Sequence, residues 1–368
     1  MPRESYLDYN ATAPLRPEAR RAMVSALDLV GNPSSVHRPG RAARAAIEEA
    51  REAVAALVGA KPVEVIFTSG ASEANATVLR GCGASALFVS AGEHVSVLAD
   101  PSVTPVALLP DGRLDLSALE TALEGGSRPL VSLMAANNET GVIQPLEAAA
   151  ALVRAHGGWL HCDAVQAAGR LAPDLWRDAD YLSLSAHKLG GPKGVGALVL
   201  RGNAPLAPLL RGGGQEWRLR AGTENVAAIA GFGAVAQSLL GLSREERAGP
   251  AGLRDAFERD LKILAPGVTI HGADAPRLAG VSCFSLPNRR AETLLIALDL
   301  AGVYVSSGSA CSSGKVERSH VLTAMGVAPA EAAAAIRVSL GWASRAEDLS
   351  RCLDALAGLL SRPGLVVA

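Results

Sequence analysis

The chain has 368 residues, of which 49% are hydrophobic and 19% are charged, a composition that excludes a disordered chain. Its 35 Lys and Arg residues nearly balance its 36 Asp and Glu residues, which argues against a partner held mainly by charge, such as nucleic acid or an anionic membrane surface. At about 150 residues per domain, this length predicts two or three domains.

The first two thirds of the chain alternate between strand and helix patterns. An irregular, extended start (1–14) precedes helical patterns at 18–29 and 41–58. Short apolar runs typical of buried strands then occur at 65–70, 86–92, 105–110, 130–138, 158–164, 180–188 and 194–200, with helical patterns at 71–79, 116–123 and 145–156. This alternation predicts an α/β fold with a mostly parallel central sheet covered by helices on both faces.

The segment between Glu224 and Arg244 contains no charged residue and approaches the length of a membrane-spanning helix. It is rich in Ala and Gly and lacks the Leu, Ile and Phe density of a lipid-facing segment. We therefore expect a buried helix, in the core or at a subunit contact, and no membrane partner.

The last third of the chain has a different pattern. A charged helix is expected at 244–263, followed by apolar runs at 281–287 and 336–342 and helices at 292–300 and 345–360. This order predicts a smaller α+β domain of residues 246–368 that packs with residues 1–14, beside a large domain of residues 15–245.

The five cysteines are widely spaced and odd in number, so neither a disulfide framework nor a CxxC zinc pattern is indicated. The first residues contain no apolar stretch typical of a secretion signal. We expect a cytoplasmic protein.

Polar residues gather where the predicted strands end, which is where open α/β sheets bind ligands. They are the turn 68–72, His94, Asn138, Asp163 with Gln166, and Ser185 with His187 and Lys188. Four of them have ordinary alternatives: a Ser of the turn 68–72 could cap a helix, Asp163 could be a solvated or capping residue, and His94 and Lys188 could have structural or surface roles.

Taken together, these residues are typical of a pyridoxal phosphate site. An amine such as Lys188 can bond covalently to an aldehyde, and Asp163 can keep the ring nitrogen protonated. A ring such as that of His94 can stack on the cofactor, and the turn that opens the helix at residue 71 can bind a phosphate.

Two further residues stand out. Cys311 lies in SSGSACSSG (306–314), where small neighbours favour a reactive thiol over a structural one. Arg337 is a lone cation in an apolar run, so it requires an anion, either a structural carboxylate or the carboxylate of a substrate.

The sequence resembles the cysteine desulfurases of the NifS/IscS type, within the fold-type I, class V aminotransferase superfamily. The similarity covers nearly the whole chain, and its motifs are YLDYNATAP (6–14), GNPSSVH, FTSGASEAN, AGEH, NNETG, HCDAVQ, SAHKLGGPKGVG, GGGQEW, RAGTEN, SSGSACSSG and IRVSLG.

The resemblance implies a role for each matching residue. Lys188 would hold pyridoxal phosphate covalently, Asp163 would pair with its ring nitrogen, Gln166 would meet its ring hydroxyl, and His94 would stack on the ring and move protons. The cofactor phosphate would be bound by Ala71, Ser72, Ser185 and His187, and by Thr223 from the neighbouring subunit of a homodimer. Asn138, which also belongs to the cofactor site, and Arg337 would hold the substrate carboxylate.

The activity implied is the conversion of L-cysteine to L-alanine, with the sulfur passing to Cys311 as a persulfide and then to an acceptor such as an iron–sulfur scaffold protein. Cys311 would also be a candidate ligand of a cluster through that persulfide. The alternatives are a selenocysteine lyase, a small-amino-acid aminotransferase, or a scaffold without activity. The sequence departs from the family pattern at Ser72, Trp217 and Arg318.

Overall fold

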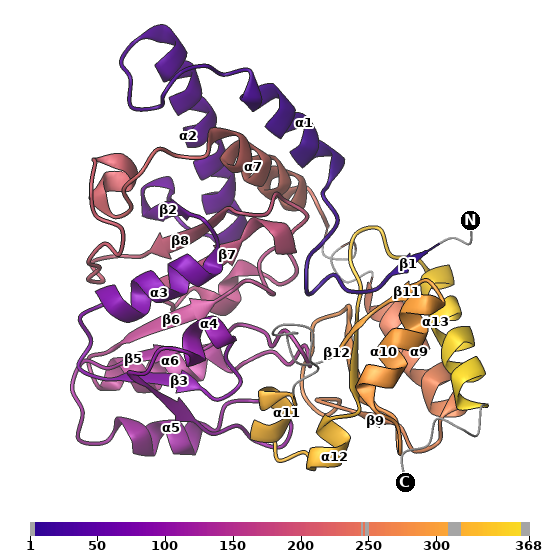
Figure 1. Ribbon diagram of the computed structural model, residues 1–368. Helices are drawn as coiled ribbons and strands as arrows, with labels where there is room; N and C mark the ends of the chain where they lie inside the picture. Colours follow the sequence, from indigo (N-terminus) through magenta and orange to yellow (C-terminus); the bar gives the residue numbers. More distant parts are fainter. Residues whose placement is uncertain (1–3, 244–245, 247–249, 308–317, 362–368) are drawn as a thin grey trace.

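The computed structural model describes residues 4–243, 246, 250–307 and 318–361. Its largest element is a seven-stranded sheet (Figure 1). The strand order is β2 (Val65–Thr68), β8 (Gly196–Leu200), β7 (Tyr181–Ser185), β6 (Trp159–Asp163), β5 (Leu130–Ser132), β3 (Leu87–Ser90) and β4 (Val103–Val106). Neighbours from β4 to β7 run parallel, whereas β8 is antiparallel to both β7 and β2. The predicted mostly parallel sheet is thus confirmed.

Helices cover both faces of this sheet, as predicted. One face packs against α2 (Arg38–Val58), α5 (Leu116–Leu123), α6 (Leu146–Ala155) and α7 (Val226–Leu240) in one apolar core. The other face packs against α3 (Ala71–Gly81) and α4 (Val95–Leu98). Consecutive residues of β2 belong to different cores, Phe67 to the first and Ile66 to the second, because side chains point alternately to the two faces of a sheet.

The uncharged segment after Glu224 forms α7, which packs against α2 and α1 (Pro17–Leu27), as Figure 1 shows. Asn225 caps its start by accepting the N–H of Ala228 at 3.1 Å. Gly233 lies where a Cβ would come within 2.5 Å of Ala50, so small residues here serve close helix packing. In the part of the chain that the structure describes, no helix is long and apolar enough to cross a membrane.

A second, smaller sheet lies toward the carboxyl end of the chain. It has four strands in the order β12 (Ser306–Ser307), β13 (Ala335–Ser339), β10 (Val281–Ser285) and β9 (Thr269–Ile270), all antiparallel. The helices of this region are α9 (Pro250–Leu264), α10 (Ala291–Leu300), α11 (His320–Ala324), α12 (Pro329–Ala332) and α13 (Ala346–Leu360). Helix α9 covers most of the charged helix expected at 244–263.

The N-terminal segment joins this smaller region. Strand β1 (Ser5–Tyr6) pairs in parallel with β11 (Val303–Tyr304), and Leu7 belongs to the same buried core as α9, α10 and α13. The sequence-based division into residues 15–245 and residues 1–14 with 246–368 stays a prediction, and the separate apolar cores support it.

Candidate active site

A cavity of about 770 Å³ opens at the carboxyl ends of the large sheet, where the N-terminal segment and β13 close it from the other side. Its size is typical of small-molecule sites. The predicted site residues on its wall are Ala71, Ser72, His94, Asn138, Asp163, Gln166, Ser185, His187, Lys188 and Arg337. The structure therefore brings together ten of the twelve predicted residues.

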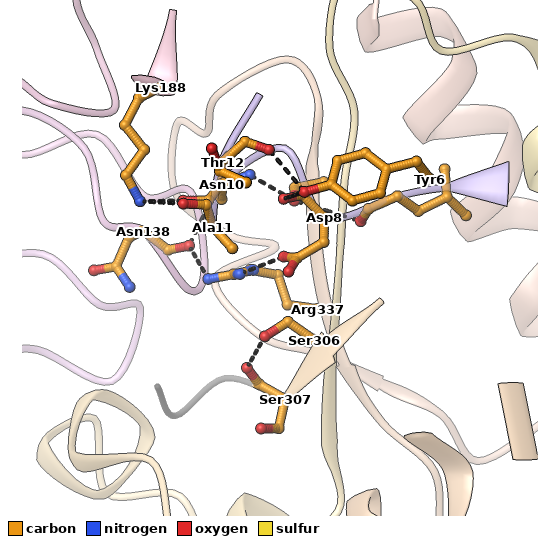
Figure 2. Close-up of polar contacts among 12 residues, drawn as sticks. Tyr6, Asp8, Asn10, Ala11, Thr12, Asn138, Lys188, Ser306, Ser307 and Arg337 are labelled. Carbon is orange, nitrogen blue, oxygen red and sulfur yellow. Dashed lines mark hydrogen bonds and ion pairs between the residues drawn. The ribbon is translucent and has the colours of Figure 1, made fainter. Parts of the chain in front are cut away.

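The amine of Lys188 follows β7 and contacts two backbone oxygens of the N-terminal segment. Its Nζ donates to the carbonyl of Asn10 at 2.6 Å and to that of Ala11 at 3.0 Å (Figure 2). Burial, reinforced by the nearby charges of Arg337 and Arg170, lowers the pKa of Lys188 to about 8. The amine is thus closer to its neutral, nucleophilic form than an exposed lysine is.

Asp163 ends β6 with its carboxylate held from two sides. Its Oδ2 accepts from Asn75 Nδ2 at 3.0 Å, and its Oδ1 accepts from the Val165 N–H at 3.0 Å. The side chain is 6% exposed. A carboxylate held in this way can support a protonated ring nitrogen.

His94 caps α4 and is fixed in one tautomer. Its Nδ1 accepts the backbone N–H of Ser96 at 3.1 Å, so the proton of the neutral ring must lie on Nε2. Burial lowers the pKa of His94, while Asp163 acts in the opposite direction. The ring is therefore a neutral imidazole near pH 7.

The turn between β2 and α3 leaves helical N–H groups free. The N-cap residue of α3 is Gly70, which has no side chain to cap the helix, so the alternative in which a Ser of the turn 68–72 is the N-cap is wrong. The first N–H groups of this 11-residue helix lack intrahelical acceptors, an arrangement that attracts phosphate. Burial and the nearby Lys188 and Lys193 lower the pKa of His187 to about 4, which makes it a neutral member of the same wall.

Arg337 has both a structural carboxylate and a spare donor. Its Nη2 donates to Asp8 Oδ1 at 2.7 Å, and its Nη1 donates to the Asn138 carbonyl at 3.0 Å (Figure 2). Its Nε is buried and has no hydrogen-bond partner within the described chain. Asp8 is thus the structural partner left open by the sequence, and Nε–H remains for a second anion.

Two predicted residues are not on the cavity wall. Thr223 is exposed in the single chain and does not line the cavity. Cys311 lies outside the described residues, so its predicted roles as nucleophile and cluster ligand stay predictions. Among the residues that the structure describes, no group of three or more His, Cys, Asp or Glu side chains could hold a metal ion.

Three contributors were missed by the sequence reasoning. Asn75 orients Asp163, Asp8 pairs with Arg337, and Asn10 supplies a carbonyl to Lys188. Each lies inside a motif quoted above, but nothing in the local sequence says that residues 8 and 10 return to β7 and β13.

Comparisons with known proteins identify the family of the chain. Residues 5–352 match the family model described as aminotransferase class-V. The chain belongs to the class-V aminotransferase family. A cysteine desulfurase of Cereibacter sphaeroides is 42% identical over 95% of this chain and 94% of that protein. A cysteine desulfurase IscS of Dictyoglomus turgidum is 41% identical over 98% of this chain and 96% of that protein.

Solved structures give the same relationship. A NifS-like protein from Rickettsia africae superposes with a TM-score of 0.89 at 33% identity, covering 98% of this chain and all of that one. The fold is that of the NifS-like, fold-type I enzymes, which confirms the fold expected from the sequence.

The residues of this class-V aminotransferase fit the family's cofactor, pyridoxal phosphate. Within the described residues, the amine of Lys188 donates hydrogen bonds to two backbone carbonyls, those of Asn10 and Ala11. Gln166 is 4% exposed and its Oε1 has no hydrogen-bond partner in the described residues, so an acceptor is available for a ring hydroxyl. The free N–H groups of α3 supply the phosphate end.

Proposed function

We propose that the chain is a pyridoxal-phosphate-dependent cysteine desulfurase that converts L-cysteine to L-alanine and passes the sulfur to Cys311. The observation that carries the proposal is the shared cavity of Lys188, Asp163 and Arg337. It joins an amine of lowered pKa, a fixed carboxylate and a guanidinium with a spare N–H. The curated relatives named cysteine desulfurase support the choice of reaction.

In this proposal Lys188 holds pyridoxal phosphate covalently, Asp163 meets its ring nitrogen and Gln166 its ring hydroxyl, while Ala71, Ser72, Ser185 and His187 hold its phosphate. When bound, the cofactor supplies an electron sink for the substrate α-carbon.

The remaining residues of the cavity bind the substrate and move its proton. In this proposal the Asn138 amide and the Nε–H of Arg337, which has no partner in the described residues, hold the substrate carboxylate, while Asp8 and the Asn138 carbonyl fix the orientation of the guanidinium. Lys188 and neutral His94 are the candidate bases for the α-proton.

Transfer of sulfur from the substrate needs one nucleophile from the protein, the thiolate of Cys311. The Cys311 thiolate forms an S–S bond to the substrate sulfur while the substrate C–S bond breaks. The bonding pair stays on carbon, which takes a proton to become L-alanine, and Cys311 is left as a persulfide. The sulfur then passes to an acceptor, for which an iron–sulfur scaffold protein is the candidate, and a cluster contact by Cys311 would follow that transfer.

The oligomeric state and the cellular location complete the proposal. Thr223, exposed in the single chain, reaches the cofactor phosphate of a partner subunit, so the working enzyme is a homodimer. We place the enzyme in the cytoplasm, since the desulfurase needs a reduced thiol at Cys311.

The test follows alanine and sulfide in parallel. Cys311→Ala is expected to lose release of alanine and sulfide from L-cysteine while it still binds pyridoxal phosphate at Lys188. Lys188→Ala is the control that loses both properties. Full turnover by Cys311→Ala contradicts the proposal. Turnover confined to L-selenocysteine favours a lyase, and pyruvate-dependent amino transfer favours an aminotransferase.

A further inference from the structure

The outer edge of β2 is completed by side chains in place of a further strand. β2 is the last strand of the large sheet and has β8 on one side only. On its free side the Val65 carbonyl accepts from Arg51 Nη1 at 2.6 Å, and the Phe67 N–H donates to Glu216 Oε2 at 2.9 Å. Unpaired edge groups of this kind otherwise go to water or another chain.

Arg51 and Glu216 also bind each other. Two hydrogen bonds join them, Nη1 to Oε2 at 2.7 Å and Nη2 to Oε1 at 2.8 Å, and their side chains are 3% and 1% exposed. Such a bidentate pair fixes both position and orientation. Arg51 comes from α2 and Glu216 from a turn far along the chain, so the pair ties two distant elements to one strand.

The turn that carries Glu216 has an unusual backbone. Glu216, Trp217 and Arg218 have φ values of 42°, 53° and 68°, which non-glycine residues adopt only when their surroundings hold them there. The Trp217 ring lies over the Arg51 guanidinium at 4.5 Å. Trp217, a departure from the family pattern, therefore stacks on this ion pair.

β2 leads directly into the turn that opens α3. Ser69 follows the strand, and its N–H donates to Glu73 Oε2 at 2.8 Å. Glu73 in turn accepts from Arg220 Nε at 3.0 Å, and Arg220 lies just after the strained turn. The segment 216–220 thus contacts both the strand before and the helix after residues 69–72.

We propose that the Arg51–Glu216 ion pair is a positioning unit that sets the phosphate-binding turn, residues 69–72, by completing the outer edge of β2. This inference rests on the proposed function in one respect, namely that the turn 69–72 holds the phosphate of pyridoxal phosphate. The unit touches neither substrate nor cofactor and acts through the backbone of β2.

The test separates phosphate binding from general stability. Protein freed of cofactor is titrated with pyridoxal phosphate and with pyridoxal, which lacks the phosphate, and binding is followed by absorbance. Glu216→Gln is expected to weaken pyridoxal phosphate roughly tenfold while leaving pyridoxal within about twofold. Arg51→Lys, which cannot span Val65 and both Glu216 oxygens, is the second variant and is expected to act in the same direction.

Glu48→Gln is the matched control. Glu48 is the more exposed carboxylate partner of Arg51, with its side chain 37% exposed, and its loss leaves both contacts to β2 in place. The ratio of the two affinities is expected to stay as in the wild type. Equal weakening of both compounds by Glu216→Gln and Arg51→Lys, or no weakening at all, overturns the inference. Wild-type protein that binds pyridoxal as tightly as pyridoxal phosphate overturns the phosphate site itself.

Discussion

Lys188 illustrates how surroundings tune one residue. Burial and the charges of Arg337 and Arg170 lower its pKa from 10.5 to about 8. We expect the rate of covalent capture of pyridoxal phosphate by cofactor-free protein to rise with pH and to level off just above about 8, because the neutral amine is the nucleophile. Stopped-flow absorbance measures this rate, with N-acetyl-lysine amide as the control that keeps rising to about 10.5. A protein profile that follows the free amine would contradict the assignment.

Glu139 is a buried acid whose protonation affects stability. Burial raises its pKa from 4.5 to about 7, opposed by Ser319 and Arg337. Because the folded state holds this proton more tightly, Glu139 stabilises the fold fully below about pH 4.5. That contribution is lost as the pH rises to about 7, a change of about 3 kcal/mol.

Glu139→Gln removes this titration and keeps an acceptor for Ser319. We expect the free energy of unfolding of the variant, relative to wild type, to increase by up to about 3 kcal/mol between acidic and mildly basic pH. Urea unfolding of the cofactor-free protein measures it. Glu147→Gln, at a side chain 82% exposed, is the control with no such trend. Parallel pH profiles for wild type and Glu139→Gln would exclude the raised pKa.

At the level of single residues, the sequence predicted which side chains line the cavity better than it predicted which residues hydrogen-bond to them. Lys188, Asp163 and His94 lie at strand ends, where the parallel sheet alone brings them together. The partner of Arg337 could not be predicted, since Asp8 reaches it only after β1 pairs with β11. Asn75 was missed because it lies inside helix α3, one turn after the phosphate-binding turn, and no local sequence pattern indicates that it contacts Asp163.

At the level of elements, the turn 137–141 is tightly constrained. It places Asn138 in the cavity and Glu139 against Ser319. Gly141 has a φ of 79°, and a Cβ there would lie 2.9 Å from Val281 Cβ. A side chain at this position would therefore strain the backbone and would clash with Val281.

Gly141→Ala and Gly125→Ala form a matched pair. Gly125 has a φ of 75° with nothing within 4 Å of a Cβ, so its variant should lose only about 1–2 kcal/mol of unfolding free energy from backbone strain. Gly141→Ala should lose a further ~1–3 kcal/mol from overpacking. Urea denaturation compares the two. Equal losses of unfolding free energy in the two variants would mean that Val281 of β10 can move aside without an energetic penalty.

The helices of eight or more residues and the short buried strands were predicted, whereas the shortest helices were not. The helix 116–123 matches α5, whereas α4, α11 and α12 were missed, because four or five residues are too few to show a period. The direction of β8 could not be predicted either, since its apolar run fits parallel and antiparallel neighbours equally well.

For the whole molecule, four of the five cysteines are enclosed by the fold. Cys82, Cys162, Cys283 and Cys352 are buried, and burial raises the pKa of each thiol. We expect iodoacetamide to modify native protein at Cys311 alone and to modify all five cysteines in urea. Peptide mass mapping locates the label, and Cys311→Ser is the control that takes none. Rapid native labelling of any buried cysteine would contradict this picture.

The proposed homodimer leads to a prediction about cofactor retention. If Thr223 contacts the partner's cofactor, Thr223→Ala is expected to speed loss of pyridoxal phosphate about tenfold, since one hydrogen bond to a charged phosphate is lost. Thr223→Ser should restore retention, and Thr121→Ala on the exposed side of α5 should have no effect. Cofactor release is followed by absorbance after gel filtration. Unchanged retention would exclude a contact between Thr223 and the partner's cofactor.

The pairing of β1 with β11 also sets an order of events during synthesis (Figure 1). A ribosome makes Asn10 and Ala11 long before it makes β11 and β13, the strands that hold this segment in place. A nascent chain that has completed the large sheet already contains Lys188, but the carbonyls of Asn10 and Ala11 are not yet held beside its amine. The pocket is therefore completed only after β11 and β13 have been made, so we expect products truncated before β11 to bind the coenzyme poorly.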